Sequence, residues 1–358
     1  MLHRGSNDSH CSSFVLWALS SAKRLLSIVY GIRSCYHSAV ETFLRSGHCA
    51  EDNPNLQPRL RLAAEADLEE TFRIYLSSNR DLNQRLGRNV DIESHSLPAR
   101  AMAVRRNALL YDQERFWVAE FGGTLGGFGL AIRRRSFWYL AALHVLPQFQ
   151  GRGVGSKLLR RCHGDPGKGN PPQSLLCISE AANIVSTGLY SRFGIFPQSV
   201  IIQLQGAPRS LGKAGVTLCQ ADPRVDQHSI DTMDRFVLGE TRPEDHVCWN
   251  SVPSLVPYLV HERDQVSGYI YIDRDGALGP AAVKRPDLLL PTISAALTTR
   301  DAGHSPVMRI RIPGAARESL VALLSAGFEF DTGINLFLTS RNFGRLDRYL
   351  FSGADALF

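Results

Sequence analysis

The sequence has no Cys-x-x-Cys pair, although it contains seven cysteines among 358 residues. Their odd number and scattered positions are typical of reduced thiols in the cytosol and not of a disulfide framework. A zinc site requires clustered Cys and His, and the nearest approach, His246 beside Cys248, lacks a second pair. The sequence therefore predicts a cytoplasmic protein without a metal site.

Long apolar runs and basic stripes are also missing. The one apolar stretch near the start, Phe14 to Tyr30, is interrupted by Lys23 and Arg24, which argues against a membrane span and a secretory signal. The net charge of +6 suits a polyphosphate ligand, but no basic stripe with interleaved aromatic residues accompanies it. We therefore expect no membrane partner and no specific nucleic-acid partner.

Acids are scarce in the first 57 residues, where only Asp8 precedes Glu41. This basic, acid-poor composition resembles that of an organelle transit peptide, and it is also compatible with an appended extension. A breaker run, residues 51–58, closes the segment. We expect residues 1–57 to form an extension that is poorly ordered or loosely helical.

After residue 58, apolar residues recur alternately at strand spacing and at helical spacing, and 44% of the whole chain is apolar. A strand and two helices lead to three strands, then to a glycine-rich turn with its helix, and finally to a strand, a helix and a last strand. The segment 206–215, rich in Gly, Pro and basic residues, reads as a linker, and the same order of elements follows it. The pattern predicts a mixed α/β fold duplicated in tandem, with domains at 58–205 and 216–358.

The turn from Gln150 to Gly155, Gln-Gly-Arg-Gly-Val-Gly, runs from a predicted buried strand straight into a helix. Glycines let a ligand approach the backbone, and the amides and positive dipole end of the helix attract an anion. The nucleotide P-loop does not fit, because Ser156 lies where its second glycine should be. Taken alone, the turn is compatible with a phosphate site and with a purely structural turn.

Gln150-x-x-Gly153-x-Gly155, preceded by Val145-Leu-Pro147, resembles the acyl-CoA motif of the GNAT family of N-acetyltransferases. A second stretch, Asn183 to Gly194 with Leu189-Tyr190, is similar to the motif that follows in that family. The resemblance implies a mixed sheet flanked by helices, the acyl-CoA N-acyltransferase fold, with acetyl-CoA as acyl donor. The coenzyme contacts that it implies are Leu143, Val145, Gln150, Gly151, Arg152, Gly153, Val154, Gly155, Ser156, Asn183 and Ser186.

Asn183, Ser186 and Tyr190 share one helical face at i, i+3 and i+7. The resemblance implies that Tyr190 is the general acid that protonates the leaving thiolate, a role that suits a phenol neutral at pH 7. A glutamate that the family often places on the strand before the turn is absent here. Glu180 and His144 are the substitute candidates for the general base, and a structural, hydrogen-bonded His144 is the simpler interpretation.

The second half has no glycine turn, so we expect it not to hold coenzyme. In tandem members of the family a working domain is paired with a decayed one, and Gly239-x-x-Arg242-x-x-Asp245-His246 resembles a feature of such second halves. Arg242, Asp245 and His246 are accordingly candidate substrate contacts, with a salt-bridged loop as the alternative.

These features together predict an N-acetyltransferase that transfers an acetyl group to a primary amine of a small molecule or peptide by direct attack on the thioester. Cys162 and Cys177 lie in apolar runs and are expected in the core, so no covalent intermediate is predicted. The alternative is a non-catalytic acyl-CoA sensor or scaffold. The acceptor, the acyl chain length and the oligomeric state do not follow from the sequence.

Overall fold

The computed structural model describes residues 57–88, 97–164, 171–207, 211–212, 215–299, 304–353 and 357–358. Residues 57–358 form one compact unit. The predicted extension, residues 1–57, lies outside the described residues except for Gln57.

The first half of this unit follows the predicted order of strands and helices. Its elements are β1 (Arg59–Leu62), the 3-10 turn Glu65–Asp67, α2 (Leu68–Arg85), α3 (Leu97–Tyr111), the 3-10 turn Gln113–Arg115, β2 (Phe116–Phe121), β3 (Thr124–Arg133), β4 (Phe137–Val145), the 3-10 turn Pro147–Phe149, α4 (Val154–His163), β5 (Ser174–Glu180), α5 (Ile184–Arg192) and β6 (Phe196–Gly206).

The second half repeats that order. Its elements are β7 (Thr217–Gln220), α6 (Pro223–Leu238), α7 (Pro243–Asn250), β8 (Leu255–Glu262), β9 (Gln265–Asp273), β10 (Ala277–Val283), the 3-10 turn Pro286–Leu288, α8 (Leu289–Thr299), β11 (Met308–Pro313), α9 (Arg317–Ser325), β12 (Glu329–Thr339), the 3-10 turn Leu346–Arg348 and β13 (Tyr349–Leu350). The prediction of a mixed fold with a central sheet and flanking helices is confirmed.

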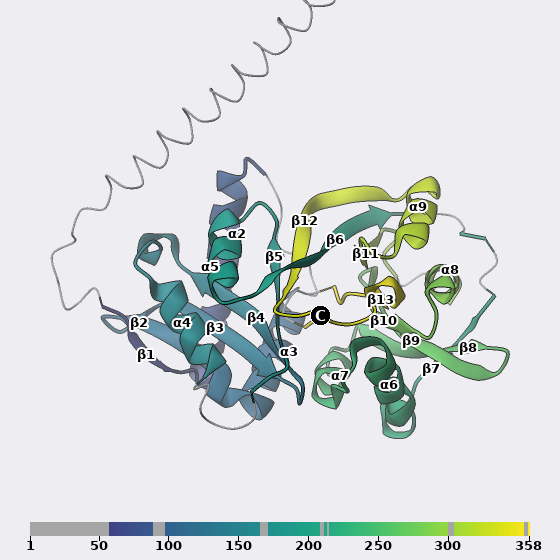
Figure 1. Ribbon diagram of the computed structural model, residues 1–358, viewed down its shortest axis with the longest axis horizontal. Helices are drawn as coiled ribbons and strands as arrows, with labels where there is room; N and C mark the ends of the chain where they lie inside the picture. Colours follow the sequence, from purple (N-terminus) through teal and green to yellow (C-terminus); the bar gives the residue numbers. More distant parts are fainter. Residues whose placement is uncertain are drawn as a thin grey trace, which may run out of the picture. The chain divides into compact units, whose positions relative to one another are not determined.

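All the described strands join one 13-stranded sheet, in the order β1-β2-β3-β4-β5-β12-β6-β11-β10-β9-β8-β7, with β13 beside β10. The last strand of each half is therefore exchanged: β12 pairs with β5, and β6 pairs with β11. The two exchanged strands also pair with each other, and Figure 1 shows them side by side between the halves. The domain boundaries 58–205 and 216–358 stay a prediction, but each side of the sheet is completed by a strand of the other half.

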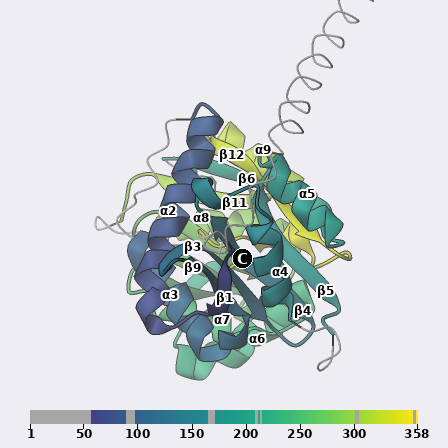
Figure 2. The ribbon, with the colours of Figure 1, turned by 90° about the vertical axis from the view of Figure 1, so that its left-hand side faces the viewer.

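Alternation along β3 explains how helices cover both faces of the first half. Phe128, Leu130 and Ile132 point to one face, where they share a core with residues of α2 and α3. Ala131 points to the other face, toward α4. Gly129 is on this second face as well, and a Cβ there would lie 2.7 Å from the sulfur of Cys162. The glycine thus lets α4 pack close to the sheet, and Figure 2 shows α2 and α3 on the opposite side from α4 and α5.

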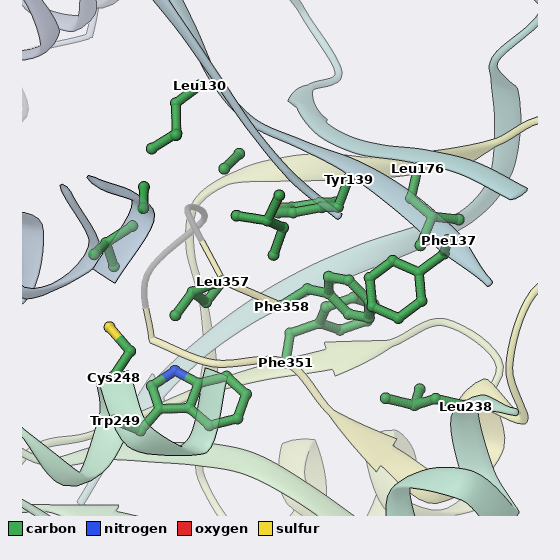
Figure 3. Close-up of a cluster of buried hydrophobic side chains, with 14 of the residues drawn as sticks. Leu130, Phe137, Tyr139, Leu176, Leu238, Cys248, Trp249, Phe351, Leu357 and Phe358 are labelled. Carbon is green, nitrogen blue, oxygen red and sulfur yellow. The ribbon is translucent and has the colours of Figure 1, made fainter. Parts of the chain in front are cut away.

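One aromatic cluster joins the two halves. The ring of Phe358 lies 5.5 Å from that of Phe137 and 4.8 Å from that of Tyr139, both on β4. Phe351 lies 5.3 Å from Phe337 of β12, and all these side chains are buried. Figure 3 shows Phe351 and Phe358 from the end of the chain facing the β4 rings. Because aromatic side chains bury large areas, this shared core binds the halves together.

Candidate active site

The sheet opens between β4 and β5. These parallel strands pair only from Phe137↔Ser174 to Leu140↔Cys177, although β4 continues to Val145 and β5 to Glu180. The register of β4 against β3 shifts at this point, so that Ala141 is an extra residue in β4. In the described part of the chain, the edge of β4 beyond Leu140 therefore has no strand partner on the β5 side, and its peptide groups can pair with a ligand.

The glycine turn lies directly after this open edge. Gly151 and Gly153 have φ of +76° and +72°, and a Cβ on either would meet no atom within 4 Å. These values are in the left-handed region that favours glycine. The side-chain amide of Gln150 donates to the carbonyl oxygen of Val145 at 2.9 Å, which ties the turn to the end of β4.

Helix α4 begins at this turn with its positive end uncapped. Gly153 is the N-cap and provides no side-chain acceptor, and no acid stands in the first helical turn. The amides of Val154, Gly155 and Ser156 have no intrahelical acceptor, because a helix cannot satisfy its first amides. An α-helix with such a start attracts an anion. By contrast, the Asn183 side chain caps α5 by accepting from the Ser186 amide at 3.2 Å.

Tyr190 lies two turns along α5 and is buried, with 6% of its surface exposed. Burial raises the pKa of its phenol, and a hydrogen bond with the Ser186 side chain lowers it by a smaller amount. The phenol is consequently neutral at physiological pH and can act as a proton donor.

The open edge, the turn and α5 line a single cavity of about 610 Å³, which also reaches α2, α3, β6 and β12. Ten of the eleven predicted coenzyme contacts line this cavity, together with Tyr190, Glu180 and His144. Arg152 does not line it and is exposed. The structure thus brings the two sequence motifs together, and their roles stay predictions.

His144 and Glu180, the two candidate bases, differ in their surroundings. The Ser78 hydroxyl donates to the Tyr75 carbonyl oxygen at 3.1 Å, and its oxygen lies 2.8 Å from Nδ1 of His144. The donor and acceptor roles of Ser78 Oγ and Nδ1 depend on the tautomer of His144: when the hydroxyl hydrogen is used for Tyr75, Nδ1 carries the ring proton and Nε2 is the proton acceptor. Burial, with the Arg105 charge, lowers the pKa of His144 to about 3. The carboxylate of Glu180 is ion-paired with Arg88 at 3.3 Å.

Several arginines in the cavity were not predicted as site residues. Arg88, Arg100 and Arg105 all line it, and Arg105 has only 5% of its surface exposed. Arg105 stands four residues after Ala101 and three before Ala108, on the inward face of α3. A charged residue on an apolar helical face is the signal that could have revealed it.

Arg242, Asp245 and His246 lie elsewhere and do not line the cavity. Arg242 and His246 are completely buried and both bind the Asp234 carboxylate, at 2.9 and 2.8 Å. Asp245 is buried too and is ion-paired with Arg134 of the first half. Their burial and ion pairing favour the salt-bridged alternative, although Asp245 and His246 lie in helix α7 and not in a loop. A contact between these residues and the acceptor stays a prediction without support from the cavity.

The second half closes the gap that the first half leaves open. Strands β10 and β11 pair only at Ala277↔Arg309 and Leu278↔Ile310, as β4 and β5 do over a short stretch. Beyond that point β13 lies against β10, with Ala281↔Leu350 and Ala282↔Tyr349, and Phe351 bridges to Arg311 of β11. The chain itself thus occupies the place that corresponds to the open edge of β4.

A sheet opened between parallel strands beside a glycine turn defines the acyl-CoA N-acyltransferase fold. Residues 77–195 match the family model described as the acetyltransferase (GNAT) family. Among curated protein sequences, none matches the chain.

Solved structures of low sequence identity share the fold. A candidate acetyltransferase of Pyrococcus horikoshii is 14% identical with a TM-score of 0.66, over 87% of this chain and all of that one. A GCN5-related N-acetyltransferase of Sphaerobacter thermophilus is 16% identical with a TM-score of 0.52, over 81% of this chain and 98% of its own. The tandem GNAT protein from the clavulanic acid biosynthesis pathway is 13% identical with a TM-score of 0.51, over 80% of this chain and 99% of its own.

In the described part of the chain, no helix is both long and apolar enough to cross a bilayer. The same residues contain no group of three His, Cys, Asp or Glu side chains arranged to hold a metal ion.

Proposed function

We propose that the protein is an N-acetyltransferase that transfers an acetyl group from acetyl-CoA to a primary amine. The observation that carries the proposal is the open edge of β4 beside the uncapped start of α4, with a neutral buried tyrosine in the same cavity. The family match at residues 77–195 supports the class of reaction.

The coenzyme would be held at two places. The amides of Val154, Gly155 and Ser156 suit its pyrophosphate, because they point along the axis of α4 from its positive end. The unpaired peptide groups of β4 near Leu143 and Val145 suit the amide-rich pantetheine arm, which would pair there as a short strand does. Gly151 and Gly153 keep the approach free of side chains.

The reaction is a direct transfer. The amine nitrogen forms a bond to the thioester carbonyl carbon, the carbon–sulfur bond breaks, and Tyr190 supplies a proton to the departing thiolate. The amine loses a proton to His144 or to Glu180, the two candidate bases that line the cavity. Cys162 and Cys177 are buried, and burial raises the pKa of both thiols, so neither suits a nucleophile.

The alternative is a protein that binds acyl-CoA without transferring the acyl group. A sensor needs the turn and the open strand edge but has no need of a proton donor. The placement of Tyr190 in the same cavity, with a hydrogen bond to Ser186, favours the enzyme.

The coenzyme site is tested by Gly153→Val, with Gly239→Val at the end of α6 as the matched control. Both glycines are in the left-handed helical region, with φ and ψ of 72° and 8° at Gly153 and of 85° and −1° at Gly239, and both have open space around the Cβ position, so the backbone strain is comparable. We expect Gly153→Val to weaken acetyl-CoA binding by at least about tenfold in calorimetry, because the valine stands where the pyrophosphate approaches. Gly239→Val should bind normally. Equal binding by both variants would refute the site.

A further inference from the structure

The cavity is lined by many more positive than negative side chains. Arg85, Arg88, Arg100, Arg105 and Arg192 contribute to its wall, and Glu180 is the one acid among the described residues that line it. An acceptor amine is itself positively charged before reaction, so a cavity built for a plain cationic amine would be expected to carry acids. The charge of this cavity points to an acceptor that also bears a negative group.

Most of these arginines already have carboxylate partners. Arg85 pairs with Asp81 at 2.7 Å, and Arg88 pairs with Glu180 at 3.3 Å. Arg100 is ion-paired with the buried Asp273 of β9. These pairs compensate the charges of their arginines, so none of the three requires a ligand.

Arg105 has only neutral partners among the described residues. Its Nε donates to the Thr71 hydroxyl at 3.0 Å, and its terminal nitrogens donate to the carbonyl oxygens of Ala101 at 3.0 Å and Thr71 at 3.3 Å. Its guanidinium lies 5.3 to 6.0 Å from the ring centres of Phe72, Tyr75 and Phe128. A guanidinium carries five N–H groups, so after these three bonds two have no acceptor in the described part of the chain.

A buried charge without a counter-charge is costly, and burial accordingly lowers the pKa of Arg105 to about 10. Cation–π contacts offset part of that cost. The hydrogen bonds hold the guanidinium in one orientation against the cavity wall, as a preorganised binding group requires. A carboxylate or phosphate oxygen would use the remaining N–H groups and supply the missing charge.

The position of Arg105 relates it to the reaction. The rings of Tyr75 and Phe128 contact both His144 and the Arg105 guanidinium. The positive charge of Arg105 contributes to the low pKa of His144, and both residues line the cavity. An anion bound at Arg105 would neutralise this effect and make His144 a better proton acceptor.

We propose that the acceptor is an amine that carries an anionic oxygen group, a carboxylate or a phosphate, and that Arg105 binds this group. The proposal rests on the proposed transferase function and names the acceptor class of the same site. It also makes Arg105 a determinant of specificity rather than of coenzyme binding.

Matched amines test the proposal by thiol release from acetyl-CoA. The pairs are 3-aminopropanoate with 3-aminopropanamide, and 2-aminoethyl phosphate with 2-aminoethanol; 1,4-diaminobutane is the dicationic comparison. We expect kcat/KM to be at least about tenfold higher for an anionic member than for its neutral partner. Which of the two pairs shows the larger ratio identifies carboxylate or phosphate.

Arg105→Gln should remove this preference, and Arg106→Gln should keep it. Arg106 is the next residue on α3, is exposed and pairs with Glu65, so it is the matched control. If Arg105→Gln fails to fold, Arg105→Lys is the second variant, because it keeps the positive charge but loses the planar guanidinium that binds an anion through two N–H groups. This variant should lower the preference for anionic amines while binding acetyl-CoA normally.

A wild-type protein that prefers neutral or dicationic amines would overturn the acceptor proposal and leave the transferase function intact. So would a preference that survives in a folded Arg105→Gln. Absence of thiol release with every amine, despite normal coenzyme binding, would overturn the transferase function and the acceptor proposal with it.

Discussion

At the scale of single residues, the proposed site assigns coenzyme binding and proton transfer to different groups. Gly151 and Gly153 leave the space beside the backbone of the turn free of side chains. Tyr190 contributes a phenol whose pKa is raised by burial. The buried phenol is therefore suited to the proposed role of proton donor, and it forms a hydrogen bond with the Ser186 side chain. Coenzyme affinity and turnover should consequently depend on different residues.

Tyr190→Phe tests this separation. The substitution removes one hydroxyl and retains the ring, so we expect acetyl-CoA affinity to change little and kcat to fall by about tenfold or more. Calorimetry and thiol-release kinetics on the same preparation give the two values. Unchanged turnover would remove the proton-donor role from Tyr190 and favour the acyl-CoA sensor.

At the scale of elements, most helices and strands follow from the sequence because their signals are local. The run from Phe137 to Val145 predicts β4, and the glycines at 151, 153 and 155 predict the turn. The motif at Asn183 places Tyr190 on α5 correctly. Most of the predicted contacts gather in one cavity because β4, the turn and α4 follow each other directly in the chain, and Asn183 and Ser186 join them from α5.

Features that depend on distant pairing could not be predicted. Nothing local in β12 indicates that Asn335 pairs with Glu180 of the other half. The partners of Arg242 on β9 and β13 are 27 and 107 residues away in the chain, so the motif that suggested a substrate contact could not predict the burial of this side chain. The role of Arg105 depends on which acids fail to reach it, and this requires the folded structure.

The contrast between β4 and β10 leads to a prediction for the second half. Because β13 already pairs with β10 where a pantetheine arm would pair with β4, the second half has no free strand edge there. Titration with acetyl-CoA should therefore saturate at one coenzyme per chain. Calorimetry with an independently determined active protein concentration measures the ratio, and a value of two would contradict this assignment.

At the scale of the whole molecule, buried ion pairs and the aromatic cluster make the halves one unit. Arg134 follows β3 of the first half and binds Asp112 at 2.9 Å. It also binds Asp245 of α7 in the second half, and all three side chains are almost fully buried. The single positive charge of this arginine is thus shared between two buried carboxyl groups that come from different halves.

Arg134→Met should destabilise the fold by about 3 kcal/mol, because both carboxylates lose their counter-charge inside the protein. The exposed neighbour Arg135 provides the control, and Arg135→Met should change stability by less than about 0.5 kcal/mol. Urea unfolding followed by circular dichroism gives the free energy of unfolding for each variant. Equal free energies of unfolding for Arg134→Met and Arg135→Met would show that the ion pairs of Arg134 do not hold the halves together.

The exchange of β6 and β12 also bears on how the protein assembles. Two separate copies of one half could share strands in this way only as a swapped dimer, whose formation depends on concentration. Here the partner strand is carried on the same chain, so its effective concentration is set by the connecting segment. Dilution is therefore not expected to separate the halves, and the cavity takes Asn335 of β12 from the same polypeptide as β4 and β5.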